Sequence, residues 1–302
     1  MNYFETRFDF EWKIVEFFNS LSSTILDTFV LLISFFGSGA PVIGLVLFLY
    51  YAGNKEFAKK LFFVISTSLM LNGILKTFFF AKRPFQFIGK QHVQKAPKFN
   101  GAEGTSFPSG HSQMAGSFYL SYFLNTHKTI LKVLSIFFLI TIPLSRLYLG
   151  VHFFMDSIIG LLLGLVVAIV VQKIYDKLGN NGRMYVLMIT CFIGLIFCIF
   201  NMNIVENASL FKTVGLVLGM TVGILIEESR FNYTNKVPLL NKILRCVIGA
   251  VVCLALKEGL KLILPDHNIF HFIRYFLISF IAIGVIPMFF KKEENNGKYN
   301  IL

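Results

Sequence analysis

The sequence predicts an all-α fold, a polytopic membrane helix bundle of about nine spans. Of its 302 residues, 55% are hydrophobic and 15% are charged, and the mean hydropathy is +0.69. A soluble domain of this length could not bury so much apolar surface in one core. The apolar residues also fall into runs near the ~20 residues that a helix needs to cross a bilayer. We place the spans at residues 24–52, 57–80, 109–125, 129–149, 153–173, 184–202, 210–227, 241–262 and 270–290.

The two ends of the chain and the first span have the least regular patterns. Residues 1–20 mix aromatic with acidic side chains and lack the basic start and cleavage site of a signal peptide, so we predict an interfacial amphipathic segment. Residues 37–41, Gly-Ser-Gly-Ala-Pro, interrupt the first span, which is either one broken helix or two short ones. The polar residues 293–302 are predicted to form a disordered tail.

Basic residues mark alternate ends of the predicted spans. Lysine-rich and arginine-rich short loops stay on the cytoplasmic side. The loops concerned carry Lys55, Lys59, Lys60, Lys128, Lys132, Lys173, Lys177, Arg183, Lys236, Lys242, Arg245, Lys291 and Lys292. We therefore place the opposite ends at the extracytoplasmic face of the cell membrane, together with Lys76, His111, Arg146 and His152. The positions of the basic residues at span ends account for the net charge of +12, and these residues form no continuous basic stripe. We therefore predict no nucleic-acid partner.

Few residues have the pattern of a metal site. The four cysteines lie in apolar stretches and are predicted to be packed thiols: Cys191, Cys198, Cys246 and Cys253. His267 and His271 lie four residues apart beside Asp266, but no further ligand accompanies them. We therefore predict no metal and no cofactor.

Two short segments at the outer ends of spans combine cations with a helix start. Lys76 and Arg83 lie seven residues apart at the end of the second span, where two permanent charges are costly unless they snorkel to headgroups or serve a site. Pro108 then precedes Ser109, Gly110 and His111 at the start of the third span. Backbone N–H groups of Ser109 and Gly110 at such a helix start can cradle a phosphate, with His111 beside it as a proton donor.

A third segment joins the fourth and fifth spans and contains Arg146, His152 and Asp156. Residues four apart share one face of a helix, so we expect the Asp156 carboxylate to reach the near ring nitrogen of His152. That contact would fix the tautomer and leave the far nitrogen free to react. The parity of the spans puts all three segments on one side of the membrane, as a single site requires.

The longest predicted connection, residues 82–107, leads from the first segment to the second. It contains three glycines and the basic residues Lys90, Lys95 and Lys98. We predict either a lid that attracts anionic headgroups or a solvated loop.

The three segments together resemble the type 2 phosphatidic acid phosphatase (PAP2) family, in the superfamily shared with vanadium haloperoxidases and glucose-6-phosphatase. The resemblance covers about residues 20–175 and fills every signature position. It implies a PAP2-like catalytic membrane core at residues 21–178, followed by four additional C-terminal spans at residues 179–292. Those spans form a scaffold, a homodimer surface or an enlarged lipid groove, and the residues do not decide among these. Gly215, Gly219 and Gly223 recur at intervals of four there and predict close helix packing.

The residues and the resemblance imply two-step phosphoryl transfer. His152, oriented by Asp156, attacks phosphorus and forms a phosphohistidine. The cations Lys76, Arg83 and Arg146 clamp the phosphoryl oxygens, which removes the need for a metal. His111 protonates the leaving group and then activates water.

The substrate class stays open at this stage. The leading hypothesis is a phosphatase for a lipid phosphate or pyrophosphate, with undecaprenyl pyrophosphate, phosphatidylglycerophosphate and phosphatidic acid as candidates. A phosphatase for a soluble sugar phosphate such as glucose 6-phosphate is the second enzyme hypothesis, because a nine-span outline is similar to glucose-6-phosphatase. A lipid transporter or scramblase is the alternative without catalysis, but it predicts two repeat halves that the sequence does not contain.

Overall fold

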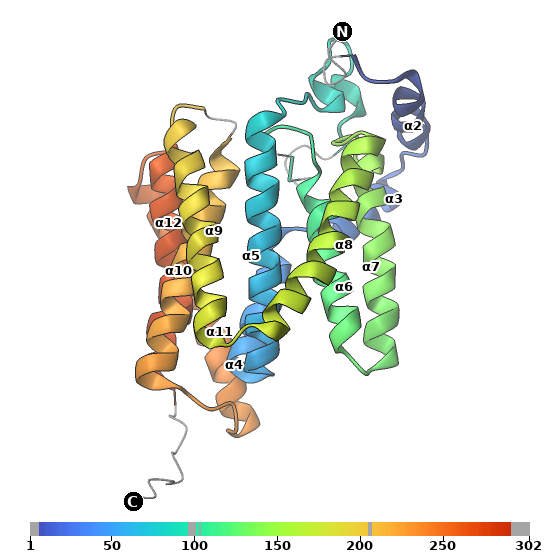
Figure 1. Ribbon diagram of the computed structural model, residues 1–302. Coiled ribbons are helices and arrows are strands. Elements are labelled where there is room, and N and C mark those ends of the chain that lie inside the picture. Colours follow the sequence, from blue (N-terminus) through green and yellow to red (C-terminus); the bar gives the residue numbers. More distant parts are fainter. Residues whose placement is uncertain (1–5, 96–100, 103, 205–206, 291–302) are drawn as a thin grey trace, which may run out of the picture.

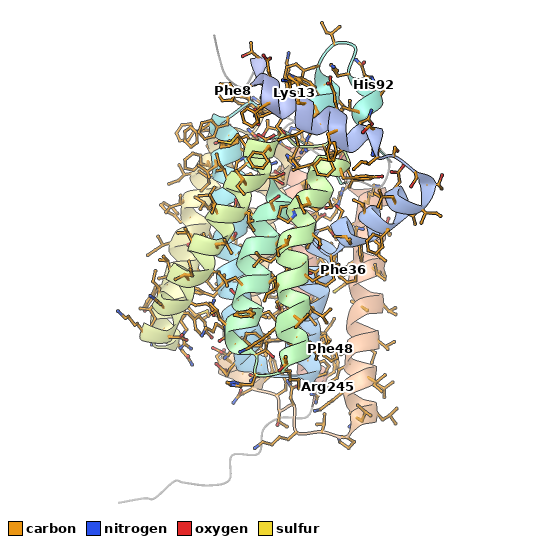
Figure 2. All side chains as sticks on the ribbon, turned by 90° about the vertical axis from the view of Figure 1, so that its right-hand side faces the viewer. Phe8, Lys13, Phe36, Phe48, His92 and Arg245 are labelled. Atoms are coloured by element: carbon orange, nitrogen blue, oxygen red, sulfur yellow. The ribbon has the colours of Figure 1, made fainter. Side chains whose placement is uncertain are left out.

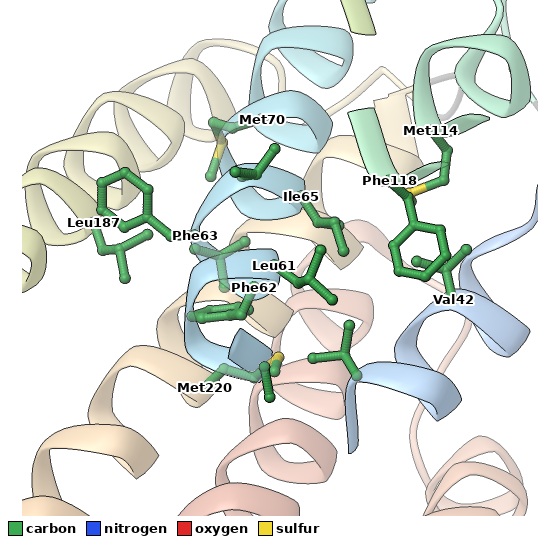
Figure 3. Close-up of a cluster of buried hydrophobic side chains, with 14 of the residues drawn as sticks. Val42, Leu61, Phe62, Phe63, Ile65, Met70, Met114, Phe118, Leu187 and Met220 are labelled. Carbon is green, nitrogen blue, oxygen red and sulfur yellow. The ribbon is translucent and has the colours of Figure 1, made fainter. Parts of the chain in front are cut away.

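Helix α5 (Lys55–Phe78) is the central helix of the structure, a computed structural model that describes residues 6–95, 101–102, 104–204 and 207–290. Its apolar side chains face helices on several sides, so that it joins two groups of helices into one bundle. Figure 3 shows this cluster, which contains Val42 of α4, Leu61, Phe62, Phe63, Ile65 and Met70 of α5, Met114 and Phe118 of α6, Leu187 of α9, and Met220 of α10. Burial of this surface against neighbouring helices holds α5 in place.

The first group of helices contains the three segments singled out in the sequence. In chain order it comprises α2 (Asp9–Ser20), α3 (Thr24–Phe35), α4 (Gly39–Ala52), α5, α6 (Gly110–Asn125), α7 (Thr129–Tyr148) and α8 (Phe154–Lys177). Two short 3₁₀ turns, η1 (Pro84–Gln86) and η2 (Gln91–Val93), lie in the connection between α5 and α6.

The second group supplies the four predicted C-terminal spans. They are α9 (Asn180–Phe200), α10 (Ala208–Ile226) with the π-helical turn η4 (Glu227–Phe231), α11 (Leu239–Ile263), and α12 (Asn268–Phe280) continued by η5 (Ile281–Val285) and η6 (Ile286–Phe289). Successive long helices alternate in direction, so the end of α5, the start of α6, the end of α7 and the start of α8 lie at the same end of the bundle (Figure 1). The predicted parity of the three segments is therefore found in the structure.

The all-α polytopic fold is confirmed, but the count of nine spans is not. Seven described helices are long and apolar enough to cross a membrane, or eight if the bent pair α2 and α3 is one span. The predicted span 24–52 is two helices, because Phe36, Gly37 and Ser38 interrupt it. Helix α4 has only 14 residues, and α6 has 16. Both are shorter than a full crossing requires.

The glycine pattern of the C-terminal spans is explained by close packing, as predicted. A Cβ at Gly219 would lie 2.3 Å from the carbonyl oxygen of Phe276, and one at Gly215 would lie 2.3 Å from that of Phe272. Helices α10 and α12 therefore approach at backbone contact, a distance that larger side chains would prevent. This contact places the start of α12 beside the start of α10, which matters for the site below.

Helix α2 lies across the end of the bundle at which the three segments meet. Figure 2 shows it there beside the connection that carries His92. Its Phe8, Phe10 and Phe17 side chains are exposed on one side, whereas Val15 is buried. The location of residues 1–20 at the membrane interface stays a prediction, and residues 291–302 lie outside the described part of the chain.

Candidate active site

A cavity of about 290 Å³ lies where the three segments meet. The predicted site residues Lys76, Arg83, Gly110, His111 and His152 line it. The remaining lining comes from the break between α3 and α4, the start of α4, helices α5 and α6 with the connection between them, and α10 and α12: Gly37, Ser38, Gly39, Ile43, Leu69, Asn72, Gly101, Met114, Ser209, Lys212, Thr213, Leu216 and Tyr275. One cavity therefore brings together five of the eight predicted site residues.

The two cations of the first segment are held by the chain that precedes α6. Lys76 Nζ donates to the carbonyl oxygen of Thr105 at 2.8 Å. Arg83 Nε donates to the carbonyl of Gly104 at 3.0 Å, and its Nη1 donates to that of Val151 at 2.9 Å. Both side chains are over 90% buried, so their charges act in a medium that screens them poorly.

A tight turn between α7 and α8 sets the position of His152. Gly150 has φ of +65°, and a Cβ there would lie 1.9 Å from the carbonyl oxygen of Val93. Only glycine suits this combination of left-handed backbone and close approach. The chain then passes through Val151 and brings His152 into the cavity wall, where it is 2% exposed.

The contacts of His152 determine its tautomer. Arg83 Nη1 lies 3.1 Å from Nε2, and a guanidinium can only donate, so Nε2 carries the lone pair. The ring proton is therefore on Nδ1, which lies 3.2 Å from the hydroxyl of Ser106. Ser106 in turn donates to Asp156 Oδ2 at 2.6 Å. His152 is thus a neutral imidazole whose Nε2 lone pair accepts from Arg83, a cation of the cavity.

The predicted direct contact between His152 and Asp156 is wrong in detail. The Nδ1 to Oδ2 distance is 3.8 Å, and Ser106 bridges the two groups. The reason is that α8 begins at Phe154, so His152 lies outside the helix and the four-residue rule does not apply to it. The carboxylate instead accepts from the N–H of Phe153 at 3.0 Å, as half of a capping box.

Arg7 of the N-terminal segment binds Asp156. From the sequence, this segment was not expected to contact the site. Its Nη1 lies 3.0 Å from Asp156 Oδ1, and both side chains are fully buried. The guanidinium also lies over the ring of Phe153, with 4.5 Å to the centroid. Arg7 has φ of 57°, a left-handed conformation that costs a non-glycine residue about 1 kcal/mol or more. A strained residue here indicates that its contacts position the carboxylate.

Glu11 makes a second contact between the N-terminal segment and the first turn of α8. Its carboxylate is fully buried and accepts from the N–H of Met155 at 3.1 Å, in the first turn of α8. A negative charge at a helix start compensates unpaired N–H groups and the helix dipole. The acidic residues of segment 1–20 were the sequence feature that could have predicted this contact. No local pattern linked them to a helix 144 residues away.

Arg146 is the cation whose hydrogen bonds are least complete. It is fully buried at the end of α7, and its Nη1 donates to the hydroxyl of Ser34 at 2.5 Å. Its Nε and Nη2 atoms have no hydrogen-bond partner among the described residues. A buried guanidinium is costly unless its donors are satisfied. These two donor atoms of Arg146 can therefore donate to a bound anion.

The second segment differs from expectation at Ser109. The Ser109 N–H donates to the carbonyl of Asp156 at 2.9 Å, so it is not available to a phosphate. Its hydroxyl instead caps α6 by accepting from Ser112, and a Cβ at Gly160 would lie 2.5 Å from the Ser109 carbonyl. Ser109 thus joins the start of α6 to α8. Gly110 and His111 line the cavity, and their contact with a phosphate stays a prediction.

Two of the lysines singled out in the connection 82–107 lie in the described chain, and both bind the N-terminal helix α2. Lys90 Nζ lies 2.9 Å from a carboxylate oxygen of Glu16, and Lys95 Nζ donates to the carbonyl of Phe18 at 3.0 Å. These contacts hold the loop against α2, so they do not support a lid. Lys98 lies outside the described residues.

Comparison with known families gives the relationship suggested by this geometry. A sequence profile of the PAP2 superfamily matches residues 57–180, and a profile of the transmembrane extension of PAP2 superfamily phosphatases matches residues 211–297. The chain belongs to the PAP2 superfamily. Its first match contains every predicted catalytic residue, and its second covers most of the additional spans.

Two curated relatives match the PAP2 part of the chain. Phosphatidylglycerophosphatase B of Bacillus subtilis (strain 168) is 32% identical over 124 residues, which are 38% of this chain and 56% of that protein. The putative undecaprenyl-diphosphatase YbjG of Escherichia coli (strain K12) is 29% identical over 143 residues, or 47% of this chain and 69% of that protein. The chain therefore spans little more than half the length of the first relative.

Two crystal structures are also similar to the chain. One is Aquifex aeolicus LpxE, with 28% identity and a TM-score of 0.47, covering 55% of this chain and 97% of that one. The other is a PAP2 type phosphatidylglycerolphosphate phosphatase from Bacillus subtilis, with 24% identity and a TM-score of 0.47, covering 56% and 86%.

The environment of His152 in this PAP2 core favours a neutral imidazole. Burial lowers its pKa well below the ordinary value, and the positive charges of Arg83, Arg146 and Lys76 lower it further. Among the described residues, no group of three or more His, Cys, Asp or Glu side chains is placed to hold a metal. The arrangement can therefore bind a phosphoryl group between cations and present to it an unprotonated ring nitrogen.

Proposed function

We propose that the protein is a metal-independent membrane phosphatase that hydrolyses a lipid phosphate or pyrophosphate through a phosphohistidine at His152. The observation that carries this proposal is the group of buried cations around a neutral imidazole. Lys76, Arg83 and Arg146 provide three positive charges, and Arg146 keeps two buried donors without partners among the described residues. A tetrahedral dianion would satisfy those donors and balance the charge.

The proposed reaction has two displacements at phosphorus. In the first, His152 Nε2 forms the N–P bond, the bond from phosphorus to the leaving oxygen breaks, and His111 gives that oxygen a proton. In the second, a water gives its proton to His111 and attacks phosphorus, the N–P bond breaks, and inorganic phosphate leaves. The Nδ1 proton stays directed at Ser106 and Asp156, which stabilise the positive charge of the ring during attack.

A lipid substrate is supported by the apolar part of the cavity lining. Ile43, Leu69, Met114 and Leu216 line it as well as the cations, and all four belong to helices of the bundle. A headgroup can lie among the cations while acyl or prenyl chains extend between helices. The names of the curated relatives point to phosphatidylglycerophosphate and undecaprenyl diphosphate as the first substrates to test.

The test is release of inorganic phosphate by purified protein in detergent, with a metal chelator present. The substrates are phosphatidylglycerophosphate, undecaprenyl pyrophosphate, phosphatidic acid and glucose 6-phosphate. We expect release from at least one of the three lipids and little from the sugar phosphate. Preference for glucose 6-phosphate would favour the soluble-substrate hypothesis, and no release from any of the four would contradict phosphatase activity.

We also propose that the active site faces the extracytoplasmic side of the cell membrane, because the lysine-rich loops lie at the opposite end. The matched substitutions Ile88→Cys and Lys236→Cys test this, since both side chains are exposed and lie at opposite ends of the bundle. A membrane-impermeant maleimide should label intact cells through Cys at position 88 alone. Labelling through position 236 alone would reverse the orientation.

A further inference from the structure

A second cavity, of about 640 Å³, lies beside the catalytic cavity and is built almost entirely by the C-terminal extension. It lies between the start of α10, the end of α11 and the start of α12. Its lining residues are Gly104, Ala208, Ser209, Lys212, Lys257, Lys261, Asp266, His271, Arg274 and Tyr275. We call it the basic vestibule.

The vestibule has more positive than negative charge. Among the described residues, Lys212, Lys257, Lys261 and Arg274 line it together with the carboxylate of Asp266. Asp266 lies 3.2 Å from the ring of His271, and Lys257 Nζ lies 3.5 Å from a carboxylate oxygen of the exposed Glu258. Exposed carboxylates offset neighbouring cations only in part, so an anion in the cavity would be attracted to this lining.

Arg274 is a buried cation in the lining of the vestibule, whereas Lys257 and Lys261 are exposed. Its side chain is 94% buried on α12, and Nη2 makes one long hydrogen bond, 3.4 Å, to the carbonyl of Leu264. Its Nε has no hydrogen-bond partner among the described residues. A guanidinium desolvated to this extent and left incompletely bonded is suited to an anionic oxygen.

The vestibule and the catalytic cavity share a wall. Ser209, Lys212 and Tyr275 line both cavities. On the core side the vestibule touches Gly104, whose carbonyl accepts from Arg83 Nε at 3.0 Å. The shared residues and Gly104 thus make the vestibule the neighbour of the cavity that contains Arg83.

We propose that the basic vestibule binds a second, non-reacting phosphate group of the substrate. This inference rests on the proposed function and sharpens it: the preferred substrates carry two phosphate groups, as a diphosphate or as a phosphomonoester linked to a phosphodiester. The C-terminal extension then takes part in substrate selection through α10, α11 and α12. Phosphatidic acid and glucose 6-phosphate have a single phosphate and gain nothing from the vestibule.

The test compares kcat/KM for substrates with two phosphates and with one. The double variant Lys257→Gln/Lys261→Gln alters exposed side chains and should fold normally. We expect it to lower kcat/KM for phosphatidylglycerophosphate or undecaprenyl pyrophosphate about tenfold, mainly through KM, and to leave phosphatidic acid unchanged. Arg274→Gln should act in the same direction. Lys242→Gln, at the other end of α11, is the matched control and should change nothing.

The outcomes separate the vestibule from the proposed function. Phosphate release by the unaltered protein supports the phosphatase whatever the variants do. An equal loss for substrates with one and two phosphates would mean that the lysines only attract anions or membranes, and would overturn the subsite. No loss for any substrate in either vestibule variant would overturn it as well.

Discussion

Two clusters of buried charge lie at opposite ends of α5, and they differ in how well their charges are balanced. At the end away from the cavity, Glu227 is fully buried and accepts from Lys55 Nζ at 2.7 Å, from the Tyr50 hydroxyl at 3.0 Å and from the Tyr233 N–H at 3.0 Å. Lys59 nearby lies 2.5 Å from Glu228. Every charge named here has an opposite charge beside it.

At the catalytic end the balance is different. Lys76, Arg83 and Arg146 surround His152, whereas the carboxylate of Asp156 is already paired with Arg7. The hydrogen bonds described for these three cations go to carbonyl and hydroxyl oxygens and to the ring of His152, whereas the lysines of the other cluster bind carboxylates. We infer from this difference that the paired cluster stabilises the fold and that the cations around His152 serve a ligand of opposite charge.

The largest effect is expected at His152, the proposed nucleophile. His152→Ala should lower kcat by about four orders of magnitude or more, because no other group can form the covalent intermediate. His127→Ala, at an exposed position beyond the far end of α6, is the control and should keep normal activity. Substantial phosphate release by the His152→Ala protein would remove the basis for the mechanism.

Arg146 tests the unbalanced cluster directly. Arg146→Lys should lower kcat/KM by about 10²- to 10³-fold, since an ammonium cannot reproduce the guanidinium fork. Arg146→Met should be equally inactive, yet its thermal midpoint in detergent should stay the same or rise, because an incompletely paired buried charge has been removed. A large drop in that midpoint would show that Arg146 serves the fold.

Ser106 tests the bridge to Asp156. Ser106→Ala should lower kcat by about 10- to 100-fold, since the Nδ1 proton of His152 loses its acceptor and the ring its orientation. Ser66→Ala is the matched control, a buried serine on α5 outside the cavity lining. Equal activity of the two variants would mean that the bridge has no role in catalysis.

The pH profile reports the charge around His152. Its pKa is lowered, so the neutral form persists as pH falls, and the acid limb of kcat/KM should lie below about pH 6.5. Arg83→Gln removes one of the charges that lower this pKa, so its acid limb should move to higher pH. An unchanged limb in a variant with residual activity would show that another group titrates.

Glu227 should have the smallest effect on activity and a clear effect on stability. Glu227→Gln leaves Lys55 without its carboxylate partner and should lower the free energy of unfolding by about 3 kcal/mol. The kcat/KM of the folded protein should not change, because the cluster lies at the far end of α5. A drop in kcat/KM without a drop in stability would make the comparison of the two ends invalid.

The all-α bundle, and the meeting of the candidate site residues at one end of it, could be predicted from the sequence because both depend on short-range patterns. Apolar runs predict spans, and their parity brought Lys76, His111 and His152 to one end of the bundle. The first span was less certain, and the structure divides it at Phe36 to Ser38 into two helices.

Other parts of the site depend on contacts that no local pattern encodes. Arg7 and Asp156 are 149 residues apart, and the vestibule combines three helices of the extension with Gly104 of the core. The bridge through Ser106 arises because His152 lies just before α8 rather than within it. Such contacts follow from how helices pack, which periodicity and spacing do not specify.

The most direct test of the central claim is to trap the covalent intermediate. Purified protein is mixed with its best substrate, quenched at alkaline pH where phosphohistidine survives, digested and analysed by mass spectrometry. The account predicts one phosphoryl group on the peptide that contains His152, in larger amounts in the His111→Ala variant because water attack is slowed. Turnover without phosphorylation, or phosphorylation of a different residue, would contradict it.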